Sequence, residues 1–138
     1  MFKSVRIYTD GGARGNPGPA GSGAVIKSLD KGVEETVSTV KKFFPHATNN
    51  QAEYDAIIIG LEEAKRLGAE EVELVMDSEL AVKQIRGEYR VKNPELAKKF
   101  LEVYNLSQAF KKFNARHIFR EKNKEADALV NEVIDENI

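Results

Sequence analysis

The hydrophobic period of this chain changes near residue 50, and that change restricts the possible folds more than any other feature. Before it, apolar and polar residues alternate as they do in strands, for example around Val5 and Ile7. The segment Asp30-Lys31-Gly32 suits a hairpin turn between two such runs. The sequence therefore predicts an antiparallel meander of three strands, over residues 3–9, 20–28 and 33–42.

After residue 50 the apolar residues recur at helical spacing. A helix is predicted from Asn50 to Leu67, with Gly68 suited to end it. The elements predicted beyond it are a strand over 71–76, a helix over 78–85, a longer helix opened by Pro94, a strand over 114–119 and a helix over 123–134. This order, βββαβααβα, predicts an α/β fold in which a five-stranded mixed sheet carries helices on its faces.

Size and composition suit one domain, so residues 1–138 are expected to form a single unit with its own core. No apolar run has membrane-spanning length, and the first residues pass into a strand pattern without a signal peptide. The chain contains no cysteine, which excludes disulfides and thiolate chemistry. Because that suits a reducing compartment, we expect the chain to be cytoplasmic.

The net charge of −1 conceals an uneven distribution. Residues 53–79 hold nine acids and two bases, whereas residues 81–99 hold six bases and two acids. A basic region beside an acidic one is typical of a surface that binds phosphate and metal. The alternative for each charge run alone is a solvated helix face.

Four acidic residues stand at or near predicted strand ends or helix starts: Asp10, Glu53, Asp77 and Asp127. In a mixed sheet such positions gather at one edge, so four carboxylates are expected to face one another. Carboxylates in such a cluster repel one another and raise their own pKa values unless hard cations neutralise them. A pair of Mg²⁺ ions is the natural occupant, and paired Mg²⁺ ions suit phosphodiester hydrolysis.

Each acid alone also has an ordinary structural interpretation. Asp10-Gly11-Gly12 can be a turn, and Glu53 can complete a capping box that starts at Asn50. Asp77 can cap the following helix, while Asp127 can face the helix dipole as a solvated residue. The occurrence of all four at equivalent positions favours a site.

Two further features are less informative. The glycine-rich run from Asp10 to Gly23 lets backbone approach a phosphate or sugar, but it does not match a dinucleotide or P-loop fingerprint. His46 is expected in a loop and His117 in a strand, and neither has a partner histidine at metal-binding spacing. Both histidines are therefore expected to be structural or surface residues.

Over nearly its whole length the chain resembles type 1 ribonucleases H. The resemblance rests on Thr9-Asp10-Gly11, Asn16-Pro17-Gly18-Pro19-Ala20-Gly21, Thr48-Asn49-Asn50-Gln51-Ala52-Glu53, Asp77-Ser78 and Arg120-Glu121-x-Asn123-x-x-Ala126-Asp127, in order and with compatible spacing. It implies a ribonuclease H-like fold with sheet order 3-2-1-4-5. It also implies an endoribonuclease that hydrolyses the RNA strand of RNA–DNA hybrids and leaves 5′-phosphate and 3′-hydroxyl ends.

The family's catalytic roles carry over to the four acids. Asp10 would bridge two Mg²⁺ ions, for which Mn²⁺ could substitute. Asp127 would serve the ion that activates the attacking water, and Glu53 and Asp77 would serve the ion at the leaving 3′-oxygen.

The resemblance also implies a set of substrate contacts. The positions of Asn16, Asn49 and Asn50 touch the minor groove and the RNA 2′-hydroxyl, together with the Glu53 carboxylate. Thr48 matches the position that holds a phosphate of the DNA strand. The expected substrate-binding residues are Gly11, Gly12, Asn16, Thr48, Asn49, Asn50 and Ser78. The expected partner is an RNA–DNA hybrid, with no membrane, no obligate protein partner and a monomeric chain.

The chain departs from the family pattern in three places. The loop before Asp127 lacks the histidine that many members carry, and Lys122 and Lys124 are the candidates to replace it electrostatically. Glu79 stands where bacterial members often have a polar amide. The basic insertion that some members place between the middle helices is absent. Two alternatives remain open: a DNA-cutting integrase-like core of the same fold, and a non-catalytic module that binds nucleic acid.

Overall fold

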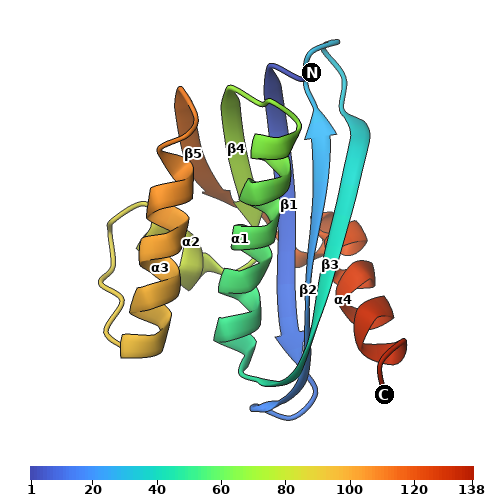
Figure 1. The fold of residues 1–138 in the computed structure, drawn as a ribbon, viewed down its shortest axis with the longest axis vertical. Coiled ribbons are helices and arrows are strands. Elements are labelled where there is room, and N and C mark those ends of the chain that lie inside the picture. Colours follow the sequence, from blue (N-terminus) through green and yellow to red (C-terminus); the bar gives the residue numbers. More distant parts are fainter.

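The computed structural model describes residues 1–138, and its strands and α-helices follow one another in the predicted order (Figure 1). The elements are β1 (Ser4–Ala13), β2 (Gly18–Ser28), β3 (Glu35–Ala47), α1 (Asn49–Arg66), β4 (Glu71–Met76), α2 (Glu79–Ile85), α3 (Pro94–Ser107), β5 (Lys112–His117), the 3₁₀ turn η1 (Arg120–Lys122) and α4 (Lys124–Asp135). No helix combines the length and the apolar character needed to cross a membrane.

All five strands belong to one mixed sheet in the order β3-β2-β1-β4-β5. The first three strands form the predicted antiparallel meander, with Ile7 opposite Ile26 in the β1–β2 register. β4 pairs with β1 in parallel, and β5 pairs in parallel with β4. The expected strand order is therefore confirmed, with β3 and β5 as the two edge strands.

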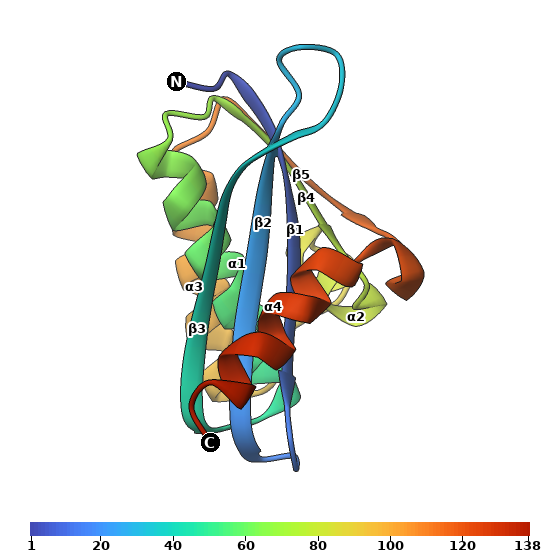
Figure 2. The ribbon, with the colours of Figure 1, turned by 90° about the vertical axis from the view of Figure 1, so that its right-hand side faces the viewer.

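Helices cover both faces of the sheet, as Figure 2 shows: α1 and α3 lie on one side and α4 lies on the other. The main core fills the space under α1 and α3, where Ile7, Ile57, Leu61 and Leu74 are fully buried. The local sequence supports these helices, because Pro94 opens α3 and the Asn93 side chain caps it.

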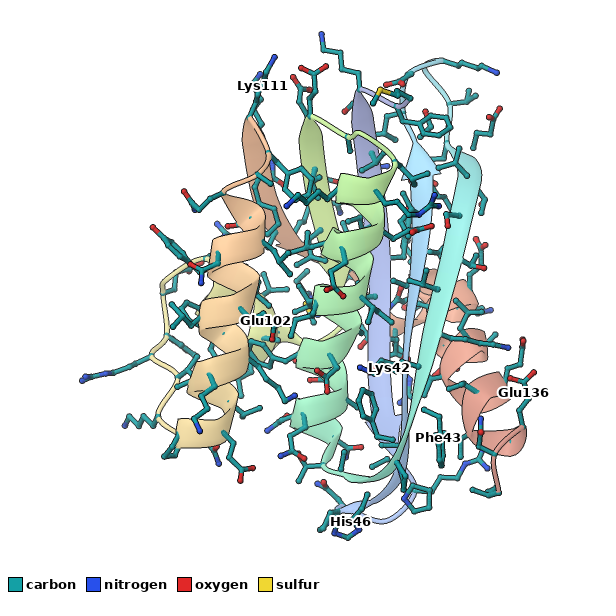
Figure 3. All side chains as sticks on the ribbon, in the orientation of Figure 1. Lys42, Phe43, His46, Glu102, Lys111 and Glu136 are labelled. Atoms are coloured by element: carbon teal, nitrogen blue, oxygen red, sulfur yellow. The ribbon has the colours of Figure 1, made fainter.

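α4 packs against the opposite face through a smaller apolar cluster of Val130, Val133 and Ile134. Phe43 of β3 packs against this cluster and lies between β3 and α4 in Figure 3. Lys41 forms ion pairs with Glu132 and Glu136 at the edge of the same contact. The C-terminal helix is thus tied to the meander rather than to β4 and β5.

Two glycines allow α1 and α4 to approach the sheet closely. A Cβ atom at Gly11 would lie 2.3 Å from the Ala52 carbonyl of α1, and one at Gly23 would lie 2.7 Å from Cβ of Leu129 in α4. Gly23 is also the β2 residue that pairs with Asp10. The first halves of α1 and α4 are therefore held close to the part of the sheet that carries Asp10.

Three predicted strand boundaries were wrong. β5 spans Lys112–His117 rather than residues 114–119. β1 continues to Ala13, so Asp10, Gly11 and Gly12 lie within the strand and not in the turn after it. β3 continues to Ala47, which places His46 in the strand rather than in a loop, and its exposed side chain lies at the end of the molecule in Figure 3. For β1 and β3, pairing with β2 extends the strand, in β1 through glycines of low strand propensity.

Candidate active site

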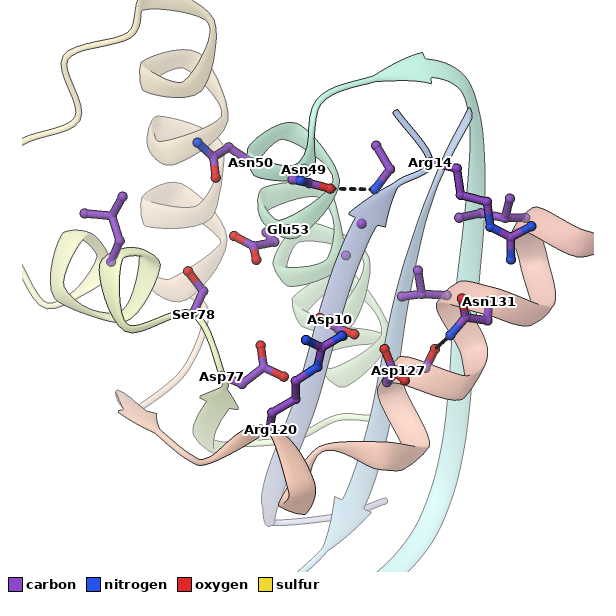
Figure 4. A pocket seen from close by; sticks show the side chains of 16 residues that line it. Asp10, Arg14, Asn49, Asn50, Glu53, Asp77, Ser78, Arg120, Asp127 and Asn131 are labelled. Carbon is purple, nitrogen blue, oxygen red and sulfur yellow. Dashed lines mark hydrogen bonds between the residues drawn. The ribbon is translucent and has the colours of Figure 1, made fainter. Parts of the chain in front are cut away.

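The four acids line one open pocket of about 740 Å³ beside β1 and the end of β4 (Figure 4). Asp10 lies on β1, Glu53 in the early turns of α1, Asp77 directly after β4 and Asp127 in the first turn of α4. Four elements that are distant in the sequence thus place their carboxylates at the same pocket. All four acids are partly buried, which keeps the carboxylates in contact with both protein and solvent.

Glu53 and Asp77 do not cap the helices that they were candidates to cap, because other side chains form those caps. The capping box of α1 is formed by Thr48 and Gln51, so Glu53 is not part of it. The cap of α2 is the Ser78 hydroxyl, which accepts a hydrogen bond from the Ala81 N–H at 3.2 Å, and not Asp77. Because neighbouring polar residues satisfy the helix ends, neither acid is needed for that purpose.

Burial and mutual repulsion raise the pKa of two of the acids. The pKa of Asp10 rises to about 8, first because the carboxyl is buried and then because Asp77 and Asp127 are close. Burial raises the pKa of Glu53 to about 7; a hydrogen bond with Ser78 opposes the rise and the charge of Asp77 adds to it. A negative field of this kind favours either bound protons or a bound cation.

The donor set fits a hard divalent cation, because every acid offers carboxylate oxygens and none offers sulfur or imidazole. No three acidic or histidine side chains stand close enough to enclose an ion by themselves. The carboxylates are therefore arranged as an open set around the pocket, and neither His46 nor His117 belongs to its lining.

Most of the predicted substrate-binding residues lie at this pocket. Gly11, Gly12, Asn49, Asn50 and Ser78 line it. The Asn49 side-chain oxygen accepts a hydrogen bond from the Ala13 N–H at 2.7 Å.

Asn16 and Thr48 do not line the pocket, but both support its rim. Asn16 Oδ1 accepts a hydrogen bond from the Asn49 N–H at 3.0 Å, which ties the loop after β1 to the start of α1. The Thr48 hydroxyl accepts from the Gln51 N–H at 3.1 Å as part of the α1 cap. The rim is thus held in place by backbone hydrogen bonds.

Known proteins resemble this chain over almost all of its length. A family model described as reverse transcriptase-like matches residues 8–133. A ribonuclease H of Pseudomonas fluorescens is 37% identical over 150 residues, which cover 99% of this chain and 95% of the relative. The chain belongs to the type 1 ribonuclease H family.

Two more family members are closer in sequence. A bifunctional protein of Mycobacterium tuberculosis is 42% identical over 131 residues, which are 95% of this chain but 35% of that protein. The chain thus spans about a third of the length of that relative. The crystal structure of LC11-RNase H1 in complex with an RNA/DNA hybrid is 46% identical, with a TM-score of 0.88 over 96% of this chain and 97% of that one.

The ribonuclease H pocket also contains residues that sequence reasoning did not assign to it. They are Ala13, Arg14, Leu80, Arg120, Val130, Asn131 and Ile134. Figure 4 shows the Arg120 side chain directed toward the carboxylates. Arg120 belongs to the family motif before α4, and its positive charge beside an acid-rich motif was the signal that could have identified it.

The lysines expected to replace the missing loop histidine lie elsewhere. Lys122 and Lys124 line a separate cavity of about 100 Å³ together with Tyr8. Arg120 is therefore the cationic side chain that this loop contributes to the ribonuclease H pocket. Glu79 forms an ion pair with Lys83 at 3.1 Å and does not line the pocket.

Proposed function

We propose that this chain is an endoribonuclease that hydrolyses the RNA strand of RNA–DNA hybrids and leaves 5′-phosphate and 3′-hydroxyl ends. The observation that carries the proposal is the convergence of four carboxylates from β1, α1, the end of β4 and α4 on one open pocket. Membership of the ribonuclease H family supports it. The hybrid bound to LC11-RNase H1 supports the choice of substrate.

We assign Asp10, Glu53, Asp77 and Asp127 as the residues that hold two Mg²⁺ ions, with Mn²⁺ as a possible substitute. The oxygen-only donor set and the raised pKa values of Asp10 and Glu53 favour this assignment. When bound, the ions supply Lewis-acid stabilisation of charge on the phosphate and lower the pKa of a bound water. A bound cation would offset the burial and repulsion that raise the pKa values of Asp10 and Glu53.

The rest of the pocket positions the substrate in this proposal. Gly11 and Gly12 offer backbone without side chains, so a sugar-phosphate chain can approach β1 closely. The amides of Asn49 and Asn50 stand beside Glu53, where they can engage a 2′-hydroxyl without reading bases. The Asn16 contact with Asn49 keeps this edge in place.

Basic residues outside the pocket supply charge for the sugar-phosphate backbone in the same proposal. Lys83 lies on α2, and Arg86 and Arg90 follow that helix in the sequence. Phosphate contacts of this kind give affinity without sequence preference. Residues 1–138 would then act as one catalytic domain and as a monomer, in a reducing compartment such as the cytoplasm, which the absence of cysteine favours.

A cleavage assay on a labelled RNA–DNA hybrid tests this function. We expect Mg²⁺-dependent cleavage of the RNA strand, with 5′-phosphate ends, and no cleavage of a matched DNA duplex. Asp10→Asn serves as the inactive control, because it keeps the shape of the side chain and removes its charge.

Two results would contradict the proposal. Efficient cutting of the DNA duplex would favour an integrase-like core. Binding of the hybrid without cleavage in the presence of either metal would favour a non-catalytic module.

A further inference from the structure

Asn123 joins two of the elements that carry the acids. Its side chain is almost completely buried, with 1% of its surface exposed. Its Nδ2 donates one hydrogen bond to the Thr9 carbonyl oxygen at 2.9 Å and another to Oδ2 of Asp77 at 3.2 Å. Thr9 directly precedes Asp10 within β1, so the amide connects the middle of β1 to the carboxylate that follows β4.

The backbone of Asn123 adds a third connection. Its carbonyl oxygen accepts a hydrogen bond from the Asp127 N–H at 3.1 Å, in the first turn of α4. The side-chain amide of Asn123 therefore contacts both Asp77 and Thr9, which precedes Asp10. The backbone carbonyl of Asn123 contacts Asp127.

A helix-capping role does not explain this side chain. Asn123 occupies the N-cap position of α4, where asparagine commonly caps, yet its side chain makes no capping hydrogen bond. Asn93 at the start of α3 does cap its helix, with Oδ1 accepting from the N–H groups of Glu95 and Leu96. The Asn123 side chain turns away from its own helix toward the site.

The orientation of the Asn123 side chain leaves a buried polar atom without a hydrogen-bond partner. Its Oδ1 and the Thr9 hydroxyl are the two buried side-chain polar atoms of the structure without a hydrogen-bond partner. Buried polar atoms are nearly always paired, so an exception calls for a reason beyond local stability. The bonds that Nδ2 donates to the Asp77 carboxylate and to the Thr9 carbonyl beside Asp10 provide that reason.

We propose that Asn123 is a positioning residue of the ribonuclease site, whose amide orients the Asp77 carboxylate and holds the middle of β1 and the end of β4 next to the start of α4. The proposal rests on the proposed function, because it assigns Asp77 to the metal ions. The amide occupies Oδ2 of Asp77 and thereby sets the direction of the whole carboxylate. Such hydrogen bonds to ligating carboxylates commonly change metal affinity or activity by 10- to 100-fold.

Two substitutions separate positioning from capping. Asn123→Ala removes the amide, and Asn123→Ser removes it while restoring a residue that caps helices well. We expect both variants to bind Mg²⁺ at least about tenfold more weakly in calorimetry without substrate. We also expect kcat on the hybrid to fall by about 10- to 100-fold, while KM for the hybrid stays close to that of the unaltered protein.

Asn93→Ala and Asn93→Ser form the matched control pair. Asn93→Ala should lower the thermal stability and Asn93→Ser should largely keep it, and both should bind Mg²⁺ like the unaltered protein. Recovery of Mg²⁺ affinity in Asn123→Ser would show that Asn123 acts as a cap and would overturn the proposal. Unchanged Mg²⁺ affinity in folded Asn123→Ala would overturn it as well.

A double substitution tests the route through Asp77. In an Asp77→Asn background, Asn123→Ala should weaken Mg²⁺ binding by much less than it does alone, because the carboxylate it orients is gone. Equal effects in both backgrounds would contradict the proposed contact. If the unaltered protein binds no divalent cation, the proposed function fails and this inference fails with it; if it binds and cleaves normally, the variants test the inference alone.

Discussion

Asp10 experiences the strongest electrostatic conflict among the four acids. Burial, the charge of Asp77 and the proximity of Asp127 all raise the pKa of its carboxyl, whereas only the hydrogen bond from the Gly11 backbone opposes them. This residue therefore makes the folded protein less stable in order to provide a negative site, a pattern that is common at functional positions.

Asp10→Asn should separate stability from activity. Without added metal we expect the free energy of unfolding at pH 7 to rise by roughly 1–3 kcal/mol, since a buried repelling charge is lost. Cleavage of the hybrid should be abolished. Thermal denaturation and the cleavage assay measure the two effects, and near-normal activity with Mg²⁺ would show that Asp10 holds no essential ion.

The raised pKa of Asp10 also predicts how stability depends on pH. Between its ordinary value of 3.8 and its folded value of about 8, the folded state retains a proton that the unfolded state has lost. Stability from this group is thus fully present below the lower value and is lost as the pH rises through the upper one. Glu53, with a pKa of about 7, acts in the same direction.

We therefore expect the Tm of the metal-free protein to fall by several degrees from pH 5 to pH 8. Acids with lowered pKa values, such as Glu34 and Glu73, act in the opposite sense, but they act near and below pH 4.5. Added Mg²⁺ should flatten the slope, and so should Asp10→Asn. A Tm that rises over this range in metal-free protein would contradict the assigned pKa directions.

Arg120 provides a prediction that the sequence alone did not suggest. Because its guanidinium lines the acid pocket, Arg120→Ala should lower kcat on the hybrid, by about tenfold for the loss of a positioned charge. Lys122→Ala removes a cation from the same loop but lines a different cavity, so its kcat should stay within about twofold. Equal losses of kcat in both variants would show that the positive charge of the loop matters, and not the position of Arg120 in the pocket.

At the scale of elements, the close approach of α4 to β2 determines where Asp127 stands. In Gly23→Ala the new methyl group would meet Leu129 Cβ at 2.7 Å and the Ala126 carbonyl oxygen at 3.0 Å. We expect a loss of about 1–3 kcal/mol in stability, because α4 must shift outward. Activity per folded molecule should fall too, as measured by cleavage rate and denaturation on the same sample.

Gly32→Ala is the matched control for this prediction. Gly32 has a positive φ of 79° in a surface turn, and nothing lies within 4 Å of the added methyl group. The substitution should cost about 1 kcal/mol through backbone strain and leave the cleavage rate per folded molecule unchanged. A Gly23→Ala variant that behaves in the same way would show that α4 does not need this fit.

The element order and the meeting of the four acids were predictable, because hydrophobic period and strand-end positions are encoded locally. The length of β1 was not, since pairing of Gly11 and Gly12 with β2 outweighs the turn preference of glycine. The α1 cap was predicted at the wrong residue because Asn50 and Thr48 are both good capping residues. In the structure Thr48 forms the capping box, together with Gln51. The orientation of Arg120 depends on how the β5–α4 connection folds, which no local pattern reveals.

At the scale of the whole molecule, affinity for a hybrid should depend on charge that is spread along α2 and α3. The net charge of −1 conceals six basic residues between positions 81 and 99. Each phosphate that these residues neutralise adds about −0.9 to the slope of log affinity against log salt concentration. Binding of a non-cleavable hybrid should therefore weaken steeply from 50 to 200 mM salt. A slope near zero would show that residues 81–99 do not contact the phosphates of the hybrid.

The acids occupy β1, α1, the end of β4 and α4, so the four carboxylates come from residues 10 to 127 of the chain. Synthesis proceeds from the N-terminus, and Asp127 belongs to the last helix of the chain. Of these four acids, the meander and α1 contain only Asp10 and Glu53, so Asp77 and Asp127 belong to parts of the chain that are synthesised later. In the proposed function, hydrolysis therefore requires that α4 has docked on the sheet, because this helix alone carries the Asp127 carboxylate.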